Sequence, residues 1–171
     1  RKVGFNNINV DLMFGLPDQN MNDLQDTLEN VVKLNPEHVS CYSLIIEENT
    51  PFYKMYEEDK LNLPNEELER EMYRYVVSFL RQQGYQQYEI SNFSKSKREC
   101  AHNLVYWNLE EYIGCGVASH SYVDGLRYRK TENIEEYIRD IRMNKNLKLD
   151  MHKNSLKDEM EEFMFMGLRK I

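Results

Sequence analysis

The chain has 171 residues, 41% of them hydrophobic, and a formal net charge of −7. That apolar content is enough for a packed core, and the negative charge argues against a nucleic-acid binder, which normally presents a basic face. No run reaches the ~18 apolar residues that a membrane-spanning helix requires. Three widely spaced cysteines without a leader sequence are typical of reduced thiols in a cytoplasmic protein.

The chain is predicted to begin with a strand, a helix and a second strand. Residues 8–14 alternate with period two, which places Asp11 and Met13 on one face of a strand. An apolar stripe predicts a helix over residues 22–34, and residues 39–46 are rich in β-branched and aromatic side chains. This order predicts two parallel strands joined by a right-handed crossover.

Residues 47–65 are charged and contain two prolines, which predicts a long loop, either a lid or a surface excursion. A helix over residues 66–83 is predicted from its apolar face, with Asn65 as its N-cap and Gly84 just beyond its end. The next predicted elements are an extended segment or strand at 85–93, a polar loop at 94–98 and a short helix at 101–107.

The last third is predicted to contain a hairpin and two helices. The predicted elements are a strand broken by glycines at 112–122, a turn at 123–126 into a strand at 127–130, a short helix capped by Asn133, and a polar linker at 144–154. A final helix opens with Ser155 and Asp158 as a capping pair and carries a wide apolar face. That face needs cover, and the chain enters a strand soon after Arg1, so we expect a piece of a longer protein.

Two cysteine–histidine pairs are candidates for metal or nucleophile chemistry. Cys100-x-His102 and Cys115-x4-His120 contain four potential zinc ligands, although their spacing matches no compact zinc motif. Ordinary buried or partly exposed thiols are the alternative. Nothing in the spacing favours a cysteine nucleophile activated by histidine.

Glycines and one aspartate suggest a ligand site. The turn at Gly114 and Gly116 either starts a phosphate-binding loop or marks a β-bulge with close backbone approach. Asp11 lies near the carboxyl end of a predicted parallel strand, the edge where ligands bind in α/β proteins. Its carboxylate suits ribose hydroxyls or an amino group, and a structural role in capping a helix or binding a loop is the alternative.

Several segments together resemble one family. Residues 10–19 (VDLMFGLPDQ) resemble the D-L-[IM]-[FY]-G-L-P-x-Q run of radical S-adenosylmethionine (SAM) proteins related to oxygen-independent coproporphyrinogen III oxidase, and residues 39–44 with 50–52 resemble the next barrel strand. Residues 84–93 and 99–107 resemble the heme chaperone branch of that family, HemW. Residues 112–121 are similar to that branch's G-x-G-x-x-A-H run, with Ala and Ser exchanged.

The resemblance implies an α/β fold, part of a (β/α)6 radical SAM partial barrel with the start of a small helical C-terminal domain. Residues 1–143 would be the C-terminal half of the barrel with a β-hairpin extension, and residues 144–171 a linker and the first helix of the next domain. The family holds SAM and a [4Fe-4S] cluster, the latter through a Cys-x3-Cys-x2-Cys motif. This chain lacks that motif, so we do not expect it to bind the cluster.

The resemblance also implies site residues. Asp11 matches the family's SAM-contacting aspartate. Ile45 and His120 match positions that approach SAM in the oxidase branch, where other residue types stand. Gly114 and Gly116 would let the backbone approach a ligand closely.

A shared lumen face and a porphyrin site are expected as well. Cys41, Ser43 and Ile45 share one face of their strand, and we expect it to adjoin the Asp11 and Met13 face in the barrel lumen. The candidate heme-facing residues are His102 and His120, and a structural role or a place in the SAM pocket is the alternative for each.

The leading functional hypothesis is a heme chaperone that delivers heme to acceptor proteins. It rests on the His102-Asn103-x-x-Tyr106-Trp107 run, which the oxidase branch generally lacks. The second hypothesis is the oxidase, which would bind a porphyrinogen and decarboxylate its propionates oxidatively to give protoporphyrinogen IX, using a SAM-derived radical. The third is an inactive binding or structural piece that self-associates through open strand edges and apolar surface.

Overall fold

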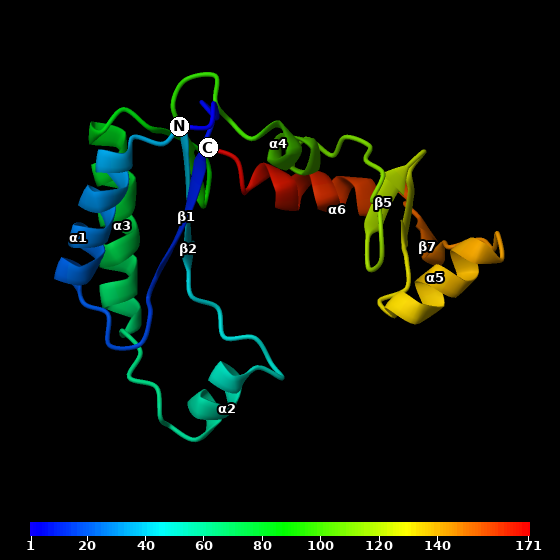
Figure 1. Cartoon of the computed structure of the whole chain (residues 1–171), viewed down its shortest axis with the longest axis horizontal. Helices are drawn as coiled ribbons and strands as arrows, with labels where there is room; N and C mark the ends of the chain where they lie inside the picture. The colour runs from blue at the N-terminus through cyan, green and yellow to red at the C-terminus, as the bar shows by residue number, and fades with distance from the viewer. The chain divides into compact units, whose positions relative to one another are not determined.

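The computed structural model describes all residues from Arg1 to Ile171 (Figure 1). The contacts divide them into two compact units: Arg1–Cys100 with Ile171, and Ala101–Lys170. The domain boundary predicted between residues 143 and 144 lies inside the second unit and stays a prediction. No helix is both long and apolar enough to pass through a membrane.

A four-stranded sheet forms the centre of the first unit, in the order β1-β2-β4-β3. Its strands are β1 (Asn9–Phe14), β2 (His38–Ser43), β3 (Gln86–Glu89) and β4 (Asn92–Ser94). β1 and β2 are parallel, which confirms the predicted strand–helix–strand unit. The extended segment predicted at 85–93 is instead a β3–β4 hairpin, in which β4 pairs antiparallel with both β2 and β3.

Two helices pack on one face of this sheet, α1 (Met21–Leu34) and α3 (Glu66–Gln82), and Figure 1 shows them side by side. Asn20 and Asn65 cap their N-termini as acceptors of backbone N–H groups, which such side chains do well. Asn35 ends α1 in the left-handed conformation, φ 53°. The buried core comprises Phe14, Leu24, Leu28, Val31, Val39, Cys41, Met72, Val76, Leu80, Tyr85 and Phe93.

The long loop predicted over residues 47–65 contains a helix, α2 (Pro51–Glu57), so that prediction was incomplete. Thr50 caps it by accepting from the Tyr53 N–H at 3.1 Å. Pro51 lies in the first turn of the helix, where its fixed φ is already helical. Its missing N–H costs no hydrogen bond there, because N–H groups of the first turn have no acceptor within the helix. No residue of α2 is buried, so its sequence lacks the apolar stripe that predicts an amphipathic helix.

The second unit combines a three-stranded antiparallel sheet with three helices. They are α4 (Ala101–Trp107), β5 (His120–Val123), β6 (Leu126–Arg129), α5 (Ile134–Arg142), β7 (Leu149–Lys153) and α6 (Leu156–Gly167). Positive φ angles at Asp124 and Gly125 form the tight β5–β6 turn, as predicted.

Two predictions for this unit need correction. Only the last part of segment 112–122 is a strand, because residues 113–119 form an irregular loop and Tyr112 makes an isolated bridge to Tyr122. The linker predicted at 144–154 contains β7, which pairs with β6 and completes the sheet. Every residue of β7 is exposed, so no one-sided apolar alternation marked it.

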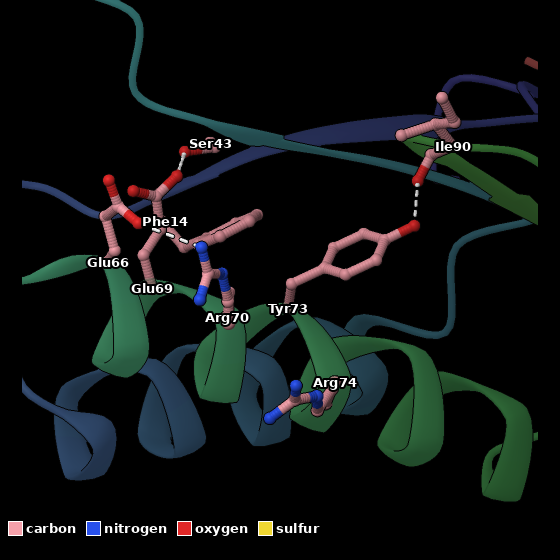
Figure 2. Close-up of a pocket in the computed structure, with 8 residues that line it drawn as sticks. All are labelled: Phe14, Ser43, Glu66, Glu69, Arg70, Tyr73, Arg74 and Ile90. Carbon is pink, nitrogen blue, oxygen red and sulfur yellow. Dashed lines mark hydrogen bonds and ion pairs between the residues drawn. The ribbon is translucent and has the colours of Figure 1, made fainter.

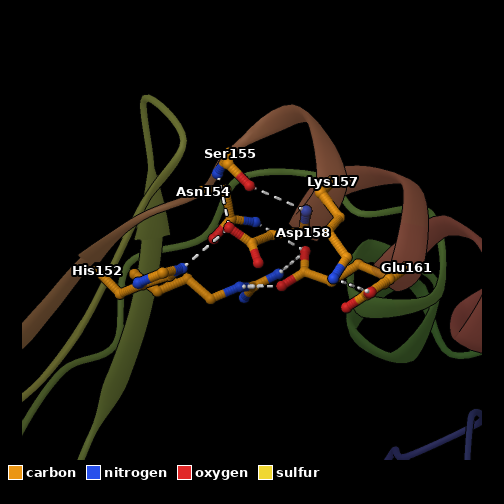
Figure 3. A network of polar contacts seen from close by, with 8 residues as sticks. His152, Asn154, Ser155, Lys157, Asp158 and Glu161 are labelled. Carbon is orange, nitrogen blue, oxygen red and sulfur yellow. Dashed lines mark hydrogen bonds and ion pairs between the residues drawn. The ribbon is translucent and has the colours of Figure 1, made fainter.

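The start of α6 is held by the capping box that the sequence predicted (Figure 3). Asp158 accepts from the Ser155 N–H at 2.7 Å, and the Asp158 N–H donates to the Ser155 hydroxyl at 3.3 Å. His152 contacts the same carboxylate at 3.3 Å. These contacts lower the Asp158 pKa, chiefly through the Ser155 backbone donor.

Candidate functional site

The first candidate region is the face of the β1–β2 pair opposite α1 and α3, which we call the polar face. Its β1 residues are Asn9, Asp11 and Met13, and its β2 residues are His38, Ser40 and Tyr42, because the parallel register aligns them pairwise. β4 adds Asn92, paired with Ser40, and Ser94, paired with His38. Buried Asn92 and Ser94 each retain an oxygen without a hydrogen-bond partner.

Asp11 is exposed on this face, as expected for a ligand-binding carboxylate. Its Oδ1 accepts a hydrogen bond from Asn9 Nδ2 at 2.5 Å. The other carboxylate oxygen is free of protein donors on the strand, so it can accept from a ligand hydroxyl or ammonium group.

The predicted shared lumen face was wrong for Cys41, Ser43 and Ile45. The register aligns Cys41 with Leu12 and Ser43 with Phe14, which places both on the helix-covered face. Cys41 is buried, and burial raises its pKa to about 12. Ile45 lies beyond the end of β2 with 74% of its surface exposed. The alternation was correct, but its phase relative to β1 follows from the register, which sequence does not reveal.

A groove of about 760 Å³ lies on the helix side, at the carboxyl ends of β1 and β2 (Figure 2). Sequence reasoning missed it, because its walls come from four separate segments. It is lined by Phe14, Ser43, Glu66, Glu69, Arg70, Tyr73, Arg74 and Ile90.

The polar groups of this groove already bind one another. Ser43 donates to Glu69, Arg70 pairs with Glu66 at 2.8 Å, and the Tyr73 hydroxyl donates to the Ile90 carbonyl at 3.1 Å. Such internal pairing leaves little uncompensated charge to recognise a ligand.

The second candidate region lies in the second unit, around His102 on α4. The imidazole is exposed, and its Nε2 lies 3.1 Å from the Tyr106 hydroxyl, one helical turn away. The two rings meet edge to face at 4.8 Å, and Tyr106 meets Tyr112 in the same way at 4.6 Å. Arg169 stacks over the Trp107 ring at 4.3 Å. Tyr106 therefore packs against one side of the His102 ring, and the aromatic cluster continues from Tyr106 to Tyr112.

Gly114, Gly116 and His120 lie together in the loop that leads into β5. A Cβ at Gly114 would overlap the carbonyl oxygen of His120, so only glycine allows this backbone approach. Gly116 has φ 96°. Gly114 therefore fits the close-approach alternative within the chain itself, whereas Gly116 has open space around it and its positive φ is what favours glycine.

His120 is exposed at the start of β5 and borders a small pocket of about 250 Å³. Arg127 and Arg129 line the same pocket. Both guanidinium groups are already paired, Arg127 with Glu162 at 2.6 Å and Arg129 with Asp150 at 2.5 Å.

The predicted site residues thus fall into two groups. Asp11 and Ile45 lie in the first unit, and His102, Gly114, Gly116 and His120 lie in the second. No group of three or more His, Cys, Asp or Glu residues is arranged to hold a metal ion. The zinc hypothesis for the two cysteine–histidine pairs therefore has no support in the geometry, and all three cysteines are free thiols.

Comparison with known proteins finds several similar sequences. No protein-family model matches the chain. The protein named heme chaperone HemW from Bacillus subtilis is 43% identical over 171 residues, which cover 99% of this chain and 45% of that protein. The protein of the same name from Lactococcus lactis is 37% identical over 170 residues, covering 99% and 44%. Radical S-adenosyl methionine domain-containing protein 1, mitochondrial, of Danio rerio is 32% identical, covering 99% and 40%.

One solved structure matches the fold. It is coproporphyrinogen III oxidase (HemN) from Escherichia coli, described as a radical SAM enzyme, with a TM-score of 0.75, 19% identity, and coverage of 99% of this chain and 42% of that one. This likeness confirms the predicted α/β radical SAM fold. The sequence matches show that the chain is similar to part of proteins named heme chaperone HemW, and the chain spans less than half the length of the curated relatives it matches.

Proposed function

We propose that this chain is part of a radical SAM heme chaperone, which binds heme and delivers it to heme-accepting proteins. The observation that carries the proposal is the 43% identity, over the whole chain, to a protein named heme chaperone HemW. The oxidase structure shares only 19% of its sequence with this chain, so that match supports the fold and not oxidase activity.

His102 is the first candidate to face heme. It is exposed, and a neutral imidazole is a common axial ligand of heme iron. The Tyr106 hydroxyl contacts Nε2, so heme would either displace that hydroxyl or approach through Nδ1. His120 is the second candidate, since it is exposed and borders a small pocket. Arg127 and Arg129 line that pocket, and each would have to exchange its carboxylate partner for a heme propionate.

The SAM contact is proposed for Asp11, with Ile45, Gly114, Gly116 and His120 as further candidates. An exposed carboxylate with one oxygen held by Asn9 fits a hydroxyl or amino group. SAM would supply radical chemistry in the family, and this chain's part would be to bind and orient it.

The residues present do not fit the [4Fe-4S] cluster. Clusters of this type are held by cysteine thiolates, and the three thiols here include Cys41, whose burial opposes ionisation. No step of the function is therefore assigned to a cluster bound by this chain.

A heme titration tests the proposal. We expect hemin to bind the purified chain with one equivalent saturating the Soret absorbance, and His102→Ala to weaken binding at least tenfold or shift the Soret band. His152→Ala is the matched control, because His152 is also exposed but lies on β7. Equal affinity of the wild type and of the His102→Ala and His120→Ala variants would remove both candidates.

The oxidase alternative has its own test, which is anaerobic conversion of coproporphyrinogen III by a form of the protein that carries a reconstituted cluster. We expect no protoporphyrinogen. Turnover with SAM consumption would replace the chaperone proposal by the oxidase. A cytoplasmic location accords with three free thiols, and self-association of the isolated chain accords with the open edge of β1.

A further inference from the structure

A continuous series of hydrogen bonds crosses the polar face of the first unit and ends at Asp11. The Cys100 N–H donates to the Tyr88 hydroxyl oxygen at 3.3 Å, and that hydroxyl lies 2.8 Å from His38 Nε2. His38 Nδ1 lies 2.7 Å from Asn9 Oδ1, and Asn9 Nδ2 donates to Asp11 Oδ1 at 2.5 Å. The series links β1, β2 and β3 to the segment after β4. The family motifs contain Asp11, Tyr88 and Cys100 but assign no role to Asn9 or His38, and the proposed heme site does not use the series.

The chemistry of Asp11 fixes the direction of every bond in the series. An ionised carboxylate can only accept, so Asn9 must present its NH2 group to Asp11 and its carbonyl oxygen to His38. An amide oxygen can only accept, so His38 must carry a proton on Nδ1. Ser40 donates to the same Asn9 oxygen at 3.3 Å, which reinforces this orientation.

The other end of the series agrees with this direction. His38 is only 5% exposed, and burial lowers its pKa although Asp11, Glu89 and Glu99 act to raise it. The neutral ring with a proton on Nδ1 has a bare Nε2, which accepts from the Tyr88 O–H. The Tyr88 oxygen in turn accepts from the Cys100 N–H. All donors therefore point the same way, and bonds in such a chain strengthen one another.

We propose that His38, acting through Asn9, is a positioning residue that holds the Asp11 carboxylate in one orientation for its ligand. Asp11 itself is exposed on a strand, where a short side chain without a fixed partner would sample several rotamers. The Asn9 amide ties down Oδ1 and leaves Oδ2 to bind a hydroxyl or amino group. The assignment of that ligand as SAM rests on the proposed function.

Substitutions at position 38 separate positioning from mere packing. His38→Asn retains a donor where Nδ1 stood, whereas His38→Leu has nearly the same size and no donor. Both variants lose the contact with Tyr88, so that loss cancels in the comparison. The Asp11 χ1 rotamer, measured from three-bond NMR couplings in the full 171-residue chain, is the readout that simple destabilisation would not move.

We expect one Asp11 rotamer in the wild type and in His38→Asn, and rotamer averaging in His38→Leu. Titration with SAM should then give an affinity about three- to tenfold weaker for His38→Leu, the cost of about one hydrogen bond, and within about twofold of wild type for His38→Asn. A single rotamer retained in His38→Leu overturns the positioning role.

Asp11→Asn distinguishes this failure from failure of the SAM assignment. If Asp11→Asn loses SAM affinity while His38→Leu does not, Asp11 contacts SAM and the positioning role is wrong. If Asp11→Asn binds SAM as tightly as the wild type, or if the wild type binds none, the SAM assignment fails and the inference for that ligand fails with it.

Discussion

Each of the two units of this chain is stabilised internally by a different kind of interaction. Every buried hydrophobic residue lies in the first unit, between Phe14 and Phe93. In the second unit the buried residues are Ser121 and Asn154, both polar. Its helices α5 and α6 instead expose large side chains, among them Ile134 at 62% and Phe163 at 71%. Apolar burial stabilises the first unit. The second unit instead relies on ion pairs and on the backbone hydrogen bonds of its sheet.

The difference bears on function, because the candidate residues divide in the same way. Asp11 lies on a strand whose other face packs on the buried core, so its backbone is firmly held. His102, Gly114 and His120 stand in a unit with little buried apolar area, where local opening costs less free energy. Under the proposed function, a firmly held strand at Asp11 would suit the SAM contact, and a more easily opened unit would suit heme entry and release.

The largest expected effect comes from the core of the first unit. Leu28 on α1 is fully buried, so Leu28→Ala should lower the free energy of unfolding by about 2–5 kcal/mol. Leu34 is on the same helix but 67% exposed, and Leu34→Ala should change it by less than about 0.5 kcal/mol. Urea unfolding followed by circular dichroism measures both. Equal losses would contradict the conclusion that apolar burial stabilises the first unit.

The second unit should respond most to a glycine in its loop. A methyl group at Gly114 would overlap backbone of His120, so Gly114→Ala should destabilise this unit by about 1–3 kcal/mol or more. Gly167, in α6, has open space at its Cβ, and Gly167→Ala should be neutral or slightly stabilising. Trp107 is the chain's one tryptophan and lies in this unit, so its fluorescence during unfolding measures both variants.

The sequence predicted some elements of both units and missed others. The α1 and α3 helices and the β5–β6 turn follow from local patterns, namely caps, apolar stripes and an Asp-Gly pair. No residue of the α2 helix or of β7 is buried, so neither element shows the periodic apolar pattern that predicts a helix or a strand.

The sequence could point to a single candidate residue of the site but not to the residues that surround it. Asp11 was a candidate because the sequence placed it near the carboxyl end of a strand, although β1 continues to Phe14. The roles of Asn9 and His38 could not be predicted, because they depend on which residues of β1 and β2 stand side by side. The same lack of register misplaced Cys41 and Ser43 on the lumen face.

A smaller effect is expected from the ion pair that joins β6 to α6. Arg127 donates from Nε to Glu162 at 2.7 Å and from its terminal nitrogen at 2.6 Å, a two-point contact. Because the pair is partly exposed, Glu162→Gln should lower the stability of the second unit by only about 1–2 kcal/mol. The control is Lys157→Gln, which removes an exposed pair with Glu161 on the same helix and should cost less than about 0.5 kcal/mol.

The same pair predicts a pH dependence. The Arg127 hydrogen bond lowers the Glu162 pKa below its ordinary value. A lowered folded-state pKa adds stability that is present above the unfolded pKa and lost as pH falls through the folded one. Wild type should therefore lose second-unit stability below about pH 4.5, and Glu162→Gln should lose less over that range. Parallel curves for the two proteins would exclude the pair as the cause.

The first unit should show a gentler pH effect that originates at His38. Burial lowers the pKa of His38, so its contribution is full above the ordinary pKa near 6.5 and declines as pH falls through the lowered folded value. One proton limits the slope to about 1.4 kcal/mol per pH unit. His38→Asn should flatten the stability profile below about pH 6.5. An unchanged slope would mean that another group titrates.

The smallest effect on unfolding, and the most specific one on association, is expected at α6. Leu156, Met160, Phe163 and Met164 form an exposed apolar face. Phe163→Ser removes no buried contact and should leave the free energy of unfolding within about 0.5 kcal/mol of wild type. If this face drives the proposed self-association, the variant should sediment as a smaller species at low micromolar concentration.

Glu161→Ser, on the same helix, is the matched control for that measurement and should leave the sedimentation of the chain unchanged. A wild-type chain that is monomeric at the same concentration would show that exposed apolar area alone does not cause association here. The open edge of β1 would then be excluded as well, since it is present in every variant. The comparison of the two units would still hold, because it rests on where apolar side chains are buried and not on what covers α6.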